Sequence, residues 1–476
     1  MAELHVAIAG RRIGTLERAA DGRLRFAYEE SWLDRRGATP LSLSMPLRPG
    51  WFDHDVVHPY LWGLLPDNED VIDRWAKQYQ CSPTNVFALL ANVGGDVAGA
   101  AQYLEPDTEA EEGVEGSYQW LDDAAVAALL REVQEDSAAW HPSHDQGRWS
   151  LAGAQSKIAL AFDDERGWAI PHGAAPTTHI LKPAITRLAD HDLNELLCVR
   201  AARRLGLSTE DASLGHFDDQ RALVVRRYDR ARIGEVMVRL HQEDFCQALG
   251  VHPNNKYQAD GGPSVEDMVG LLRDNSTAPG VDVGRLVDAV AYNWLTLGSD
   301  AHAKNYALVL AGRTVRLAPL YDLGSLAPYA KYAPKVKLAQ KVGGEYRAGA
   351  IADRHWRRLA ASARLDPDEL IARIGELADM LPDAFRDVLV DLELDTDEHD
   401  AGAKIIESIV KWTATCRQAI ERPVATEPSS PAPAPAPARR PQGRKPSGTP
   451  QGGRFTSARP DEADGHVDDE TGARRP

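Results

Sequence analysis

Two short apolar runs, residues 306–310 and 317–321, carry polar residues at their outer ends, and this arrangement constrains the chain more than any other feature. Asp300 and Asn305 precede the first run, and Asp322 follows the second. If the runs are the two strands of a hairpin, these three side chains meet at one end of it. Two carboxylates and an amide suit phosphoryl transfer, because one carboxylate can orient an attacking hydroxyl while the other oxygens hold magnesium on nucleotide phosphates.

The spacing of these residues is that of a protein kinase. Protein kinases place an Asn five residues after the Asp of the catalytic loop, and a later Asp-Phe-Gly motif supplies a second Asp. Here Asn305 follows Asp300 at the same interval, and Asp322 begins the sequence Asp-Leu-Gly. Either motif alone is weak, since Asp and Asn also fill turns through local hydrogen bonds. The two motifs in this order predict a kinase.

The composition is that of a globular chain with an acidic balance. Its 476 residues allow about two or three domains, and 43% of them are hydrophobic. The formal net charge of -17 argues against non-specific nucleic-acid binding by this chain alone, although a partner could bind DNA. The four cysteines lie singly, without the spacing of zinc ligands. Neither a signal peptide nor a bilayer-spanning apolar run is recognised, so we expect a cytosolic protein that does not contact membranes.

Residues 1–105 are predicted to form a small α+β module. Gly94, Gly95 and Gly99 link its helices to a later strand, and we interpret them as turn glycines. A phosphate-binding loop is the weaker interpretation, because no Gly-Lys-Ser/Thr follows them. The alternation and spacing of apolar residues predict a small hairpin at 4–14 that turns at Gly10, strands at 24–28 and 41–45, an apolar turn at 60–69, and helices at 71–78 and 83–91.

A turn of small residues precedes an apolar run at 158–162. Ala152, Gly153 and Ala154 would let backbone N–H groups approach phosphate oxygens without obstruction by side chains. Lys157 could add positive charge to such a loop. On these residues alone, an ordinary hairpin turn remains the alternative.

Two further segments supply the context of a nucleotide site. Residues 178–183 are a predicted strand in which Lys182 stands before a proline, as a kinase lysine that reaches the α- and β-phosphates would. Glu195 begins a helical pattern and could either pair with Lys182 or simply favour the positive end of the helix. Residues 243–245 join a strand to a helix, where a kinase holds adenine by backbone groups.

The remaining predictions concern the division of the chain. We expect an N-lobe-like nucleotide-binding region at residues 145–250 and a mostly helical C-lobe with the catalytic loop at 251–420. Residues 423–476 change abruptly to a Pro/Ala-rich spacer followed by charged residues with few apolar ones, so this tail is predicted to be disordered.

In their order these segments resemble the HipA family, the serine/threonine-kinase toxins of bacterial toxin–antitoxin pairs. The resemblance spans roughly residues 1–420 and implies a two-lobed, protein-kinase-like α+β fold with a small N-terminal module. It rests on Leu-Leu-Pro-Asp-Asn at 64–68, Ser-Leu-Ala-Gly-Ala-Gln-Ser-Lys at 150–157, Thr-His-Ile-Leu-Lys-Pro at 178–183, Gln-Glu-Asp-Phe-Cys-Gln at 242–247, Lys-Tyr-Gln-Ala-Asp-Gly-Gly-Pro at 256–263, Ser-Asp-Ala-His-Ala-Lys-Asn at 299–305 and Tyr-Asp at 321–322.

The resemblance implies a role for each candidate residue of a Mg-ATP-dependent protein kinase. Asp300 would be the catalytic base, and Asn305 and Asp322 the magnesium ligands. Ser150 stands where family members autophosphorylate, and a phosphate there would repel the nucleotide. Ser156 departs from the family, which often has Glu or Pro at this position. The implied ATP site comprises Ala152, Gly153, Ala154, Gln155, Ser156, Lys157, Lys182, Glu243, Asp244, Phe245, His302, Ala303, Lys304, Asn305, Tyr321 and Asp322.

The resemblance also implies partners. These are an antitoxin with a helix-turn-helix domain, operator DNA bound through that antitoxin, and a protein substrate of translation such as an aminoacyl-tRNA synthetase. Two other functions remain open: a catalytically silent scaffold in transcriptional repression, and a small-molecule phosphotransferase. The intact set of Lys182, Asp300, Asn305 and Asp322 argues against the scaffold. A small-molecule enzyme leaves the N-terminal module and the Ser150 loop unexplained.

Overall fold

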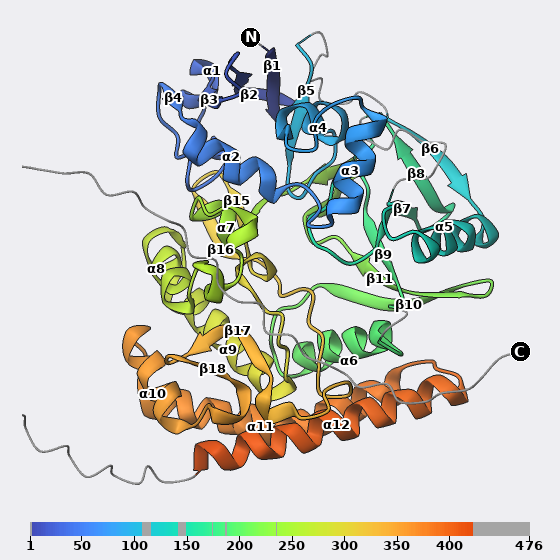
Figure 1. Ribbon diagram of the computed structural model, residues 1–476, viewed down its shortest axis with the longest axis vertical. Coiled ribbons are helices and arrows are strands. Elements are labelled where there is room, and N and C mark those ends of the chain that lie inside the picture. Colours follow the sequence, from blue (N-terminus) through green and yellow to red (C-terminus); the bar gives the residue numbers. More distant parts are fainter. Residues whose placement is uncertain are drawn as a thin grey trace, which may run out of the picture. The chain divides into compact units, whose positions relative to one another are not determined.

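A computed structural model describes residues 2–106, 116–140, 149–173, 175–185, 188–234 and 236–421 of the chain. Strands dominate the first half of this part of the chain and helices most of the second half, so the predicted α+β class is confirmed (Figure 1). The disordered tail that the sequence predicts at residues 423–476 lies outside the described residues.

The N-terminal segment forms a five-stranded antiparallel sheet in the order β4-β3-β2-β1-β5. Its first two strands join through Ala9 and Gly10, which have φ values of 51° and 70°, as the turn of a tight hairpin requires. Val6, Leu16 and Phe26 point into a core shared with the helices. The elements are β1 (Ala2–Ile8), β2 (Arg11–Arg18), β3 (Leu24–Tyr28), α1 (Glu30–Leu33), β4 (Trp51–Phe52), α2 (His54–Gly63), α3 (Glu69–Gln78), α4 (Val86–Val93) and β5 (Ala101–Leu104).

Two local predictions for this segment are wrong. Residues 41–45 contribute only an isolated bridge instead of a strand. The Tyr28 hydroxyl takes the place of a strand partner, since it accepts a hydrogen bond from the Leu41 N–H and donates one to the Met45 carbonyl. Residues 60–63 end helix α2 and do not form a turn, because the apolar residues of this stretch recur at helical spacing and share a buried face.

The second sheet, β10-β11-β9-β7-β8-β6, is also antiparallel. Strand β11 separates two hydrophobic cores, because alternate side chains of a strand point to opposite faces. Ala222 and Val224 pack into the core of the N-terminal segment, whereas Leu223 and Val225 pack into the core of the C-terminal helices. The elements are β6 (Ser117–Leu121), α5 (Asp123–Glu135), β7 (Ile158–Asp163), β8 (Gly167–His172), β9 (His179–Pro183), α6 (His191–Arg204), β10 (Asp211–Phe217) and β11 (Gln220–Arg226).

A three-stranded antiparallel sheet, β14-β15-β16, links this region to the helical part of the chain. Because β15 and β16 form a hairpin, the residues before β15 and those after β16 reach the same end of it. The second strand that the sequence predicts at 317–321 is wrong, however, since β16 ends at Leu317 and Leu320 instead bonds to the backbone of residues 208–210. The elements are β12 (Arg230–Ile233), β13 (Val236–Arg239), β14 (His241–Asp244), α7 (Phe245–Ala248), β15 (Ala307–Ala311) and β16 (Thr314–Leu317).

The C-terminal part of the described chain is mostly helical. The Trp412 indole donates to the Trp294 carbonyl over 2.8 Å and ties the last helix to α9. Helices α11 and α12 lie side by side (Figure 1). Among the residues that the structure describes, no helix combines the length and apolar character needed to cross a bilayer. The elements are α8 (Val265–Asn275), α9 (Pro279–Thr296), β17 (Lys337–Val342), β18 (Glu345–Arg347), α10 (Asp353–Ser362), α11 (Pro367–Asp391) and α12 (Thr396–Glu421).

Candidate active site

A cavity is lined by the loop at 151–157, by β9, β11 and β14, and by residues between 302 and 322. Its wall holds a buried polar atom, His302 Nδ1, that has no hydrogen-bond partner among the described residues. Such an atom retains the capacity to bind a polar ligand. The predicted ATP-site residues that line this cavity are Ala152, Gly153, Lys157, Lys182, Glu243, Asp244, His302, Lys304, Asn305, Tyr321 and Asp322.

A lysine between two carboxylates forms the centre of the cavity wall. Lys182 Nζ lies 2.6 Å from Glu195 Oε1 and 2.7 Å from Asp322 Oδ1. Of the two roles that the sequence left open for Glu195, the structure therefore supports the ion pair. Burial alone would lower the pKa of Lys182, but the charges of Asp322 and Glu195 outweigh it and raise that pKa. The charge of Lys182 in turn holds the pKa of Asp322 below its ordinary value, so both groups are ionised at neutral pH.

The hairpin brings Asn305 and Asp322 together. Asn305 Nδ2 lies 3.4 Å from Asp322 Oδ2 and donates to the Asp300 carbonyl over 3.1 Å. Asp322 has a φ of 58°, in the left-handed region that is costly for a residue with a Cβ atom. Three contacts hold this conformation in place: the ion pair with Lys182, the bond from Asn305, and the Asp322 N–H, 3.4 Å from Glu210 Oε1.

Asp300 is not among the described residues that line the cavity. Its side chain is exposed, and Oδ1 accepts a 2.6 Å hydrogen bond from the Tyr257 hydroxyl. The Tyr257 ring meets the His302 ring edge-on at 5.0 Å. Asp300 is therefore linked to the cavity wall by two contacts. Its carbonyl accepts a hydrogen bond from Asn305, and its solvent-exposed carboxylate binds Tyr257, whose ring contacts His302.

The loop at 151–157 is not a hairpin turn, because β7 pairs with β8 and β9, which both follow it. Gly153 has a φ of 106°, and a Cβ atom there would lie 2.6 Å from Lys157 Nζ. Lys157 Nζ donates to the Ala152 carbonyl over 2.5 Å. Burial, and next the charge of Lys182, lower the pKa of Lys157 to about 8. Of the described residues in this loop, Ala154, Gln155 and Ser156 do not line the cavity.

Ser150 is completely buried at the base of this loop. Its hydroxyl donates to the Leu64 carbonyl over 2.8 Å, and its N–H donates to the Asp96 carbonyl over 3.0 Å. Both partners belong to the N-terminal segment, so that segment holds the base of the loop.

The linker at 243–245 presents its side chains in three different directions. The Glu243 carboxylate accepts hydrogen bonds from Ser42 Oγ (2.5 Å) and Leu43 N–H (2.8 Å), and burial raises its pKa to about 8. Asp244 caps helix α7. Phe245 is fully buried in the C-terminal core and, like the buried Ala303, does not line the cavity as far as the described residues show. The backbone is engaged as well: the Asp244 N–H donates to Gln247 Oε1 over 3.0 Å and the Phe245 N–H to the Tyr306 carbonyl over 3.2 Å, so neither of these donors is free for a ligand.

Sequence reasoning missed three groups around the cavity. Asp67 makes ion pairs with Lys304 and Lys256. Glu210 lines the cavity, and burial raises its pKa to about 8. Tyr257 binds Asp300. The sequences around Asp67 and Tyr257 are part of the family resemblance, which was their only signal. Nothing in the spacing of residues brings position 67 next to positions 256 and 304.

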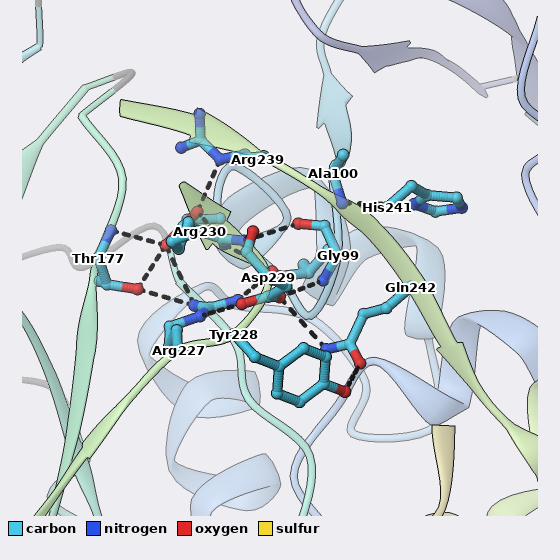
Figure 2. A network of polar contacts seen from close by, with 12 residues as sticks. Gly99, Ala100, Thr177, Arg227, Tyr228, Asp229, Arg230, Arg239, His241 and Gln242 are labelled. Carbon is cyan, nitrogen blue, oxygen red and sulfur yellow. Dashed lines mark hydrogen bonds and ion pairs between the residues drawn. The ribbon is translucent and has the colours of Figure 1, made fainter. Parts of the chain in front are cut away.

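Behind the cavity lies a buried network of ion pairs, shown in Figure 2. Arg227 binds Asp229 through two hydrogen bonds, and Arg230 binds both Asp229 and Asp96. Arg239 also binds Asp96. Burial alone would raise the pKa of Asp229, but the charges of Arg227 and Arg230 outweigh it and hold that pKa at about 2.

Gly99 joins this network to β14. Its N–H donates to Asp229 Oδ2 over 2.7 Å, and a Cβ atom at Gly99 would lie 2.9 Å from the backbone N and O of Gln242. Its φ of 84° confirms the interpretation as a turn glycine. The Gln242 side chain is fixed between Asp229 and the Tyr228 hydroxyl (Figure 2). Since Tyr228, Asp229 and Gln242 all line the cavity, the network supports its floor.

Comparison with known proteins identifies the family. Residues 4–104 match the family model described as "HipA N-terminal domain", and residues 149–385 match the one described as "HipA-like C-terminal domain". A relative from Sinorhizobium fredii named "Putative kinase Y4mE" is 38% identical over 389 residues, which cover 80% of this chain and 90% of the relative. The "Serine/threonine-protein kinase toxin HipA" of Shewanella oneidensis is 28% identical over 391 residues, which cover 78% of this chain and 86% of that protein.

A solved structure shows the same fold. It is described as the "Shewanella oneidensis MR-1 Toxin Antitoxin System HipA, HipB and its operator DNA complex", and its matching chain has a TM-score of 0.76 at 25% identity. The match covers 87% of this chain and 97% of that one. The prediction of a protein-kinase-like fold is therefore confirmed, and the chain belongs to the HipA family of kinases.

Proposed function

We propose that this protein is a Mg-ATP-dependent serine/threonine protein kinase and the toxin of a toxin–antitoxin pair. The observation that carries the proposal is the convergence of Lys182, Asn305 and Asp322 on one cavity wall. An amide and an ionised carboxylate at one end of a hairpin, with a lysine from β9 beside them, are what phosphoryl transfer requires. Kinase relatives of the same family support this function.

The nucleotide would bind with its phosphates between the loop at 152–157 and Lys182. Lys157 and Lys182 offset phosphate charge in a cavity from which much of the water is excluded, where such interactions are strong. Residues 243–245, of which Glu243 and Asp244 line the cavity, would hold the adenine. Magnesium, when bound with ATP, would neutralise phosphate charge, and the Asp322 carboxylate and the Asn305 amide oxygen are hard oxygen donors of the kind it prefers.

Asp300 would act as the catalytic base. Its exposed position suits a group that must meet a hydroxyl carried by another protein, and Tyr257 holds the carboxylate in one orientation. An oriented carboxylate near the transferred phosphoryl group places the attacking oxygen and accepts its proton.

Autophosphorylation at Ser150 would require the loop to leave its seat. The Ser150 hydroxyl is completely buried and bound to the Leu64 carbonyl, so it cannot reach a γ-phosphate in this conformation. A phosphate added there would carry about two negative charges and would not fit the buried site. The loop that cradles the nucleotide would then stay out, and the kinase would be switched off.

The partners that we propose follow from the family. The related Shewanella structure contains HipA, HipB and operator DNA. We infer for this chain a HipB-like helix-turn-helix antitoxin through which the pair represses its own operator, and a cytoplasmic substrate of the translation machinery, of the aminoacyl-tRNA synthetase class. The net charge of -17 fits a chain that reaches DNA through such a partner.

The test is mass spectrometry of the protein after incubation with Mg-ATP. We expect a phosphate on Ser150 in the wild type and none anywhere in Asp300→Asn. In Ser150→Ala the phosphate on the chain is lost, while transfer to an added protein substrate persists. A wild type that binds ATP and carries no phosphate would refute the kinase and favour a repression scaffold.

A further inference from the structure

Asp67 connects the N-terminal segment to the catalytic loop. It lies between α2 and α3, in the Leu-Leu-Pro-Asp-Asn stretch at 64–68. Asp67 Oδ1 is 2.6 Å from Lys304 Nζ, and Oδ2 is 2.7 Å from Lys256 Nζ. Its N–H donates to the Gly153 carbonyl over 3.0 Å. One residue thus contacts the phosphate-side loop, the catalytic loop and the Lys256 segment.

The charges make this contact strong. The Lys304 side chain is only 3% exposed, and a buried ammonium without an anionic partner is costly. Burial alone would raise the pKa of Asp67, but the charges of Lys304 and Lys256 outweigh it and hold that pKa at about 2. Asp67 is therefore ionised at neutral pH and fixes the direction in which both lysines point.

Lys304 needs this support because of where it lies. It occupies the loop between Asp300 and Asn305, and its ammonium lines the cavity together with Asp67. The Lys304 carbonyl accepts a 2.5 Å hydrogen bond from the Tyr321 hydroxyl, which fixes the backbone but not the side chain. The ion pair with the Asp67 carboxylate fixes the position of the Lys304 side chain.

We propose that Asp67 is a positioning residue for phosphoryl transfer: with its ion pairs to Lys304 and Lys256 it holds Lys304 at the phosphate end of the cleft, so that the N-terminal segment completes the active site of the kinase. This inference rests on the proposed function, since it assigns Lys304 to the phosphate end. Asp67 itself does not act on the reacting atoms. Its effect passes through Lys304.

The substitution Asp67→Asn keeps the size of the side chain and the backbone bond to Gly153, but removes the charge. The lysines then lose their fixed orientation, and a misplaced group in an active site costs up to about 100-fold in rate. We expect kcat to fall about 10- to 100-fold, while KM for Mg-ATP changes less than about threefold, because phosphates still attract both ammonium groups. Asp67→Glu should recover part of kcat. Asp70→Asn removes an exposed carboxylate in the first turn of α3, three residues after Asp67, and is the matched control.

A double-variant cycle separates positioning from simple damage to the fold. If Asp67 acts through Lys304, the variant Asp67→Asn with Lys304→Gln should be no slower than Lys304→Gln alone. Losses that multiply in the double variant would overturn the proposal. So would a kcat of Asp67→Asn within about twofold of the wild type.

Amine footprinting tests the geometry without relying on catalysis. Brief acetylation followed by mass spectrometry should label Lys256 and Lys304 weakly in the wild type and clearly more in Asp67→Asn, with exposed Lys77 unchanged. Equal labelling of the two lysines in both proteins would overturn the inference whether or not the protein is a kinase. A wild type that shows the footprint and transfers no phosphate would instead refute the proposed function.

Discussion

Two ionic clusters border the cleft and differ in how far their side chains are exposed. The open cluster consists of Lys182, Glu195 and Asp322, and the closed network of Asp96, Arg227, Asp229, Arg230 and Arg239. In the first, Lys182 pairs with Asp322, whose side chain is still 43% exposed toward the cleft. In the second, Arg227 and Asp229 have side chains only 2% and 3% exposed and bind each other and their neighbours. The open cluster can exchange partners with a ligand. The charges of the closed network are almost inaccessible and already paired with one another. Under the proposed function, similar ion pairs would therefore serve chemistry in one place and the fold in the other.

The largest expected effect is on the rate of phosphate transfer, and it comes from a substitution in the open cluster. Asp322→Asn removes both a proposed metal ligand and the charge that orients Lys182, so phosphate transfer should fall about 1,000-fold. The side chain is partly exposed and the substitution conserves its size, so thermal unfolding should change little. Steady-state transfer and thermal denaturation of the same sample measure both quantities. A variant that is unfolded, or that keeps more than about a tenth of wild-type transfer, contradicts this view of the open cluster.

The closed network should show the opposite behaviour. Arg227→Met leaves Asp229 and Asp96 buried with fewer partners, which should lower the free energy of unfolding by about 3–5 kcal/mol. Transfer per folded molecule should stay within about tenfold of the wild type. Chemical denaturation gives the free energy, and activity corrected for the folded fraction gives the rate.

Removing both charges provides the control for that prediction. Arg227→Met combined with Asp229→Asn should be less destabilised than the sum of the two single variants, because no uncompensated charge then remains in that pair. Simple additivity would mean that the pair does not act as a unit.

The loss of stability in acid tests whether the charge of Asp229 supports the closed network. Asp229 has a pKa of about 2 in the folded protein, below the ordinary value of about 3.9 in an unfolded chain. Its stabilisation is therefore fully present above about pH 4 and is lost as the pH falls toward 2. We expect the stability difference between the wild type and Asp229→Asn to shrink over this interval. A difference that stays constant from pH 6 to pH 2 would show that the Asp229 charge does not contribute.

The smallest expected effect comes from an ion pair at the surface. Arg131 and Asp219 lie 3.4 Å apart with side chains 45% and 67% exposed, and such pairs contribute less than about 1 kcal/mol. Asp219→Asn should therefore leave both the free energy of unfolding and phosphate transfer unchanged within error. It provides the baseline against which the other substitutions are judged.

The contacts of the open cluster were partly predictable from the sequence, whereas those of the closed network were not. The approach of Asn305 to Asp322 was predictable, because the two residues flank a hairpin of strands that are adjacent in the chain. The bounds of the second strand were not, since β16 ends at Leu317, five residues before Asp322. The pair between Lys182 and Glu195 was predictable only as one of two alternatives, since a helix N-terminus also attracts a carboxylate.

The closed network and the Asp67 contacts were not predictable from the residues alone. Asp96 and Arg230 are 134 positions apart in the sequence, and Asp67 and Lys304 are 237 positions apart. No local spacing encodes such contacts, because they depend on how the N-terminal segment packs on the rest of the chain. The error at residues 41–45 also comes from a tertiary contact, since the Tyr28 hydroxyl, a side chain of β3, replaces a strand partner.

The measurement that tests the account most directly is a crystal structure with Mg²⁺ and a non-hydrolysable ATP analogue. We predict a metal ion about 2.1 Å from an oxygen of Asp322 and from the Asn305 amide oxygen, with phosphate oxygens on Lys182 and the closed network unchanged. A nucleotide whose phosphates lie away from Lys182, or a metal ion held by neither residue, would contradict the assignment of this cleft as the active site of a kinase.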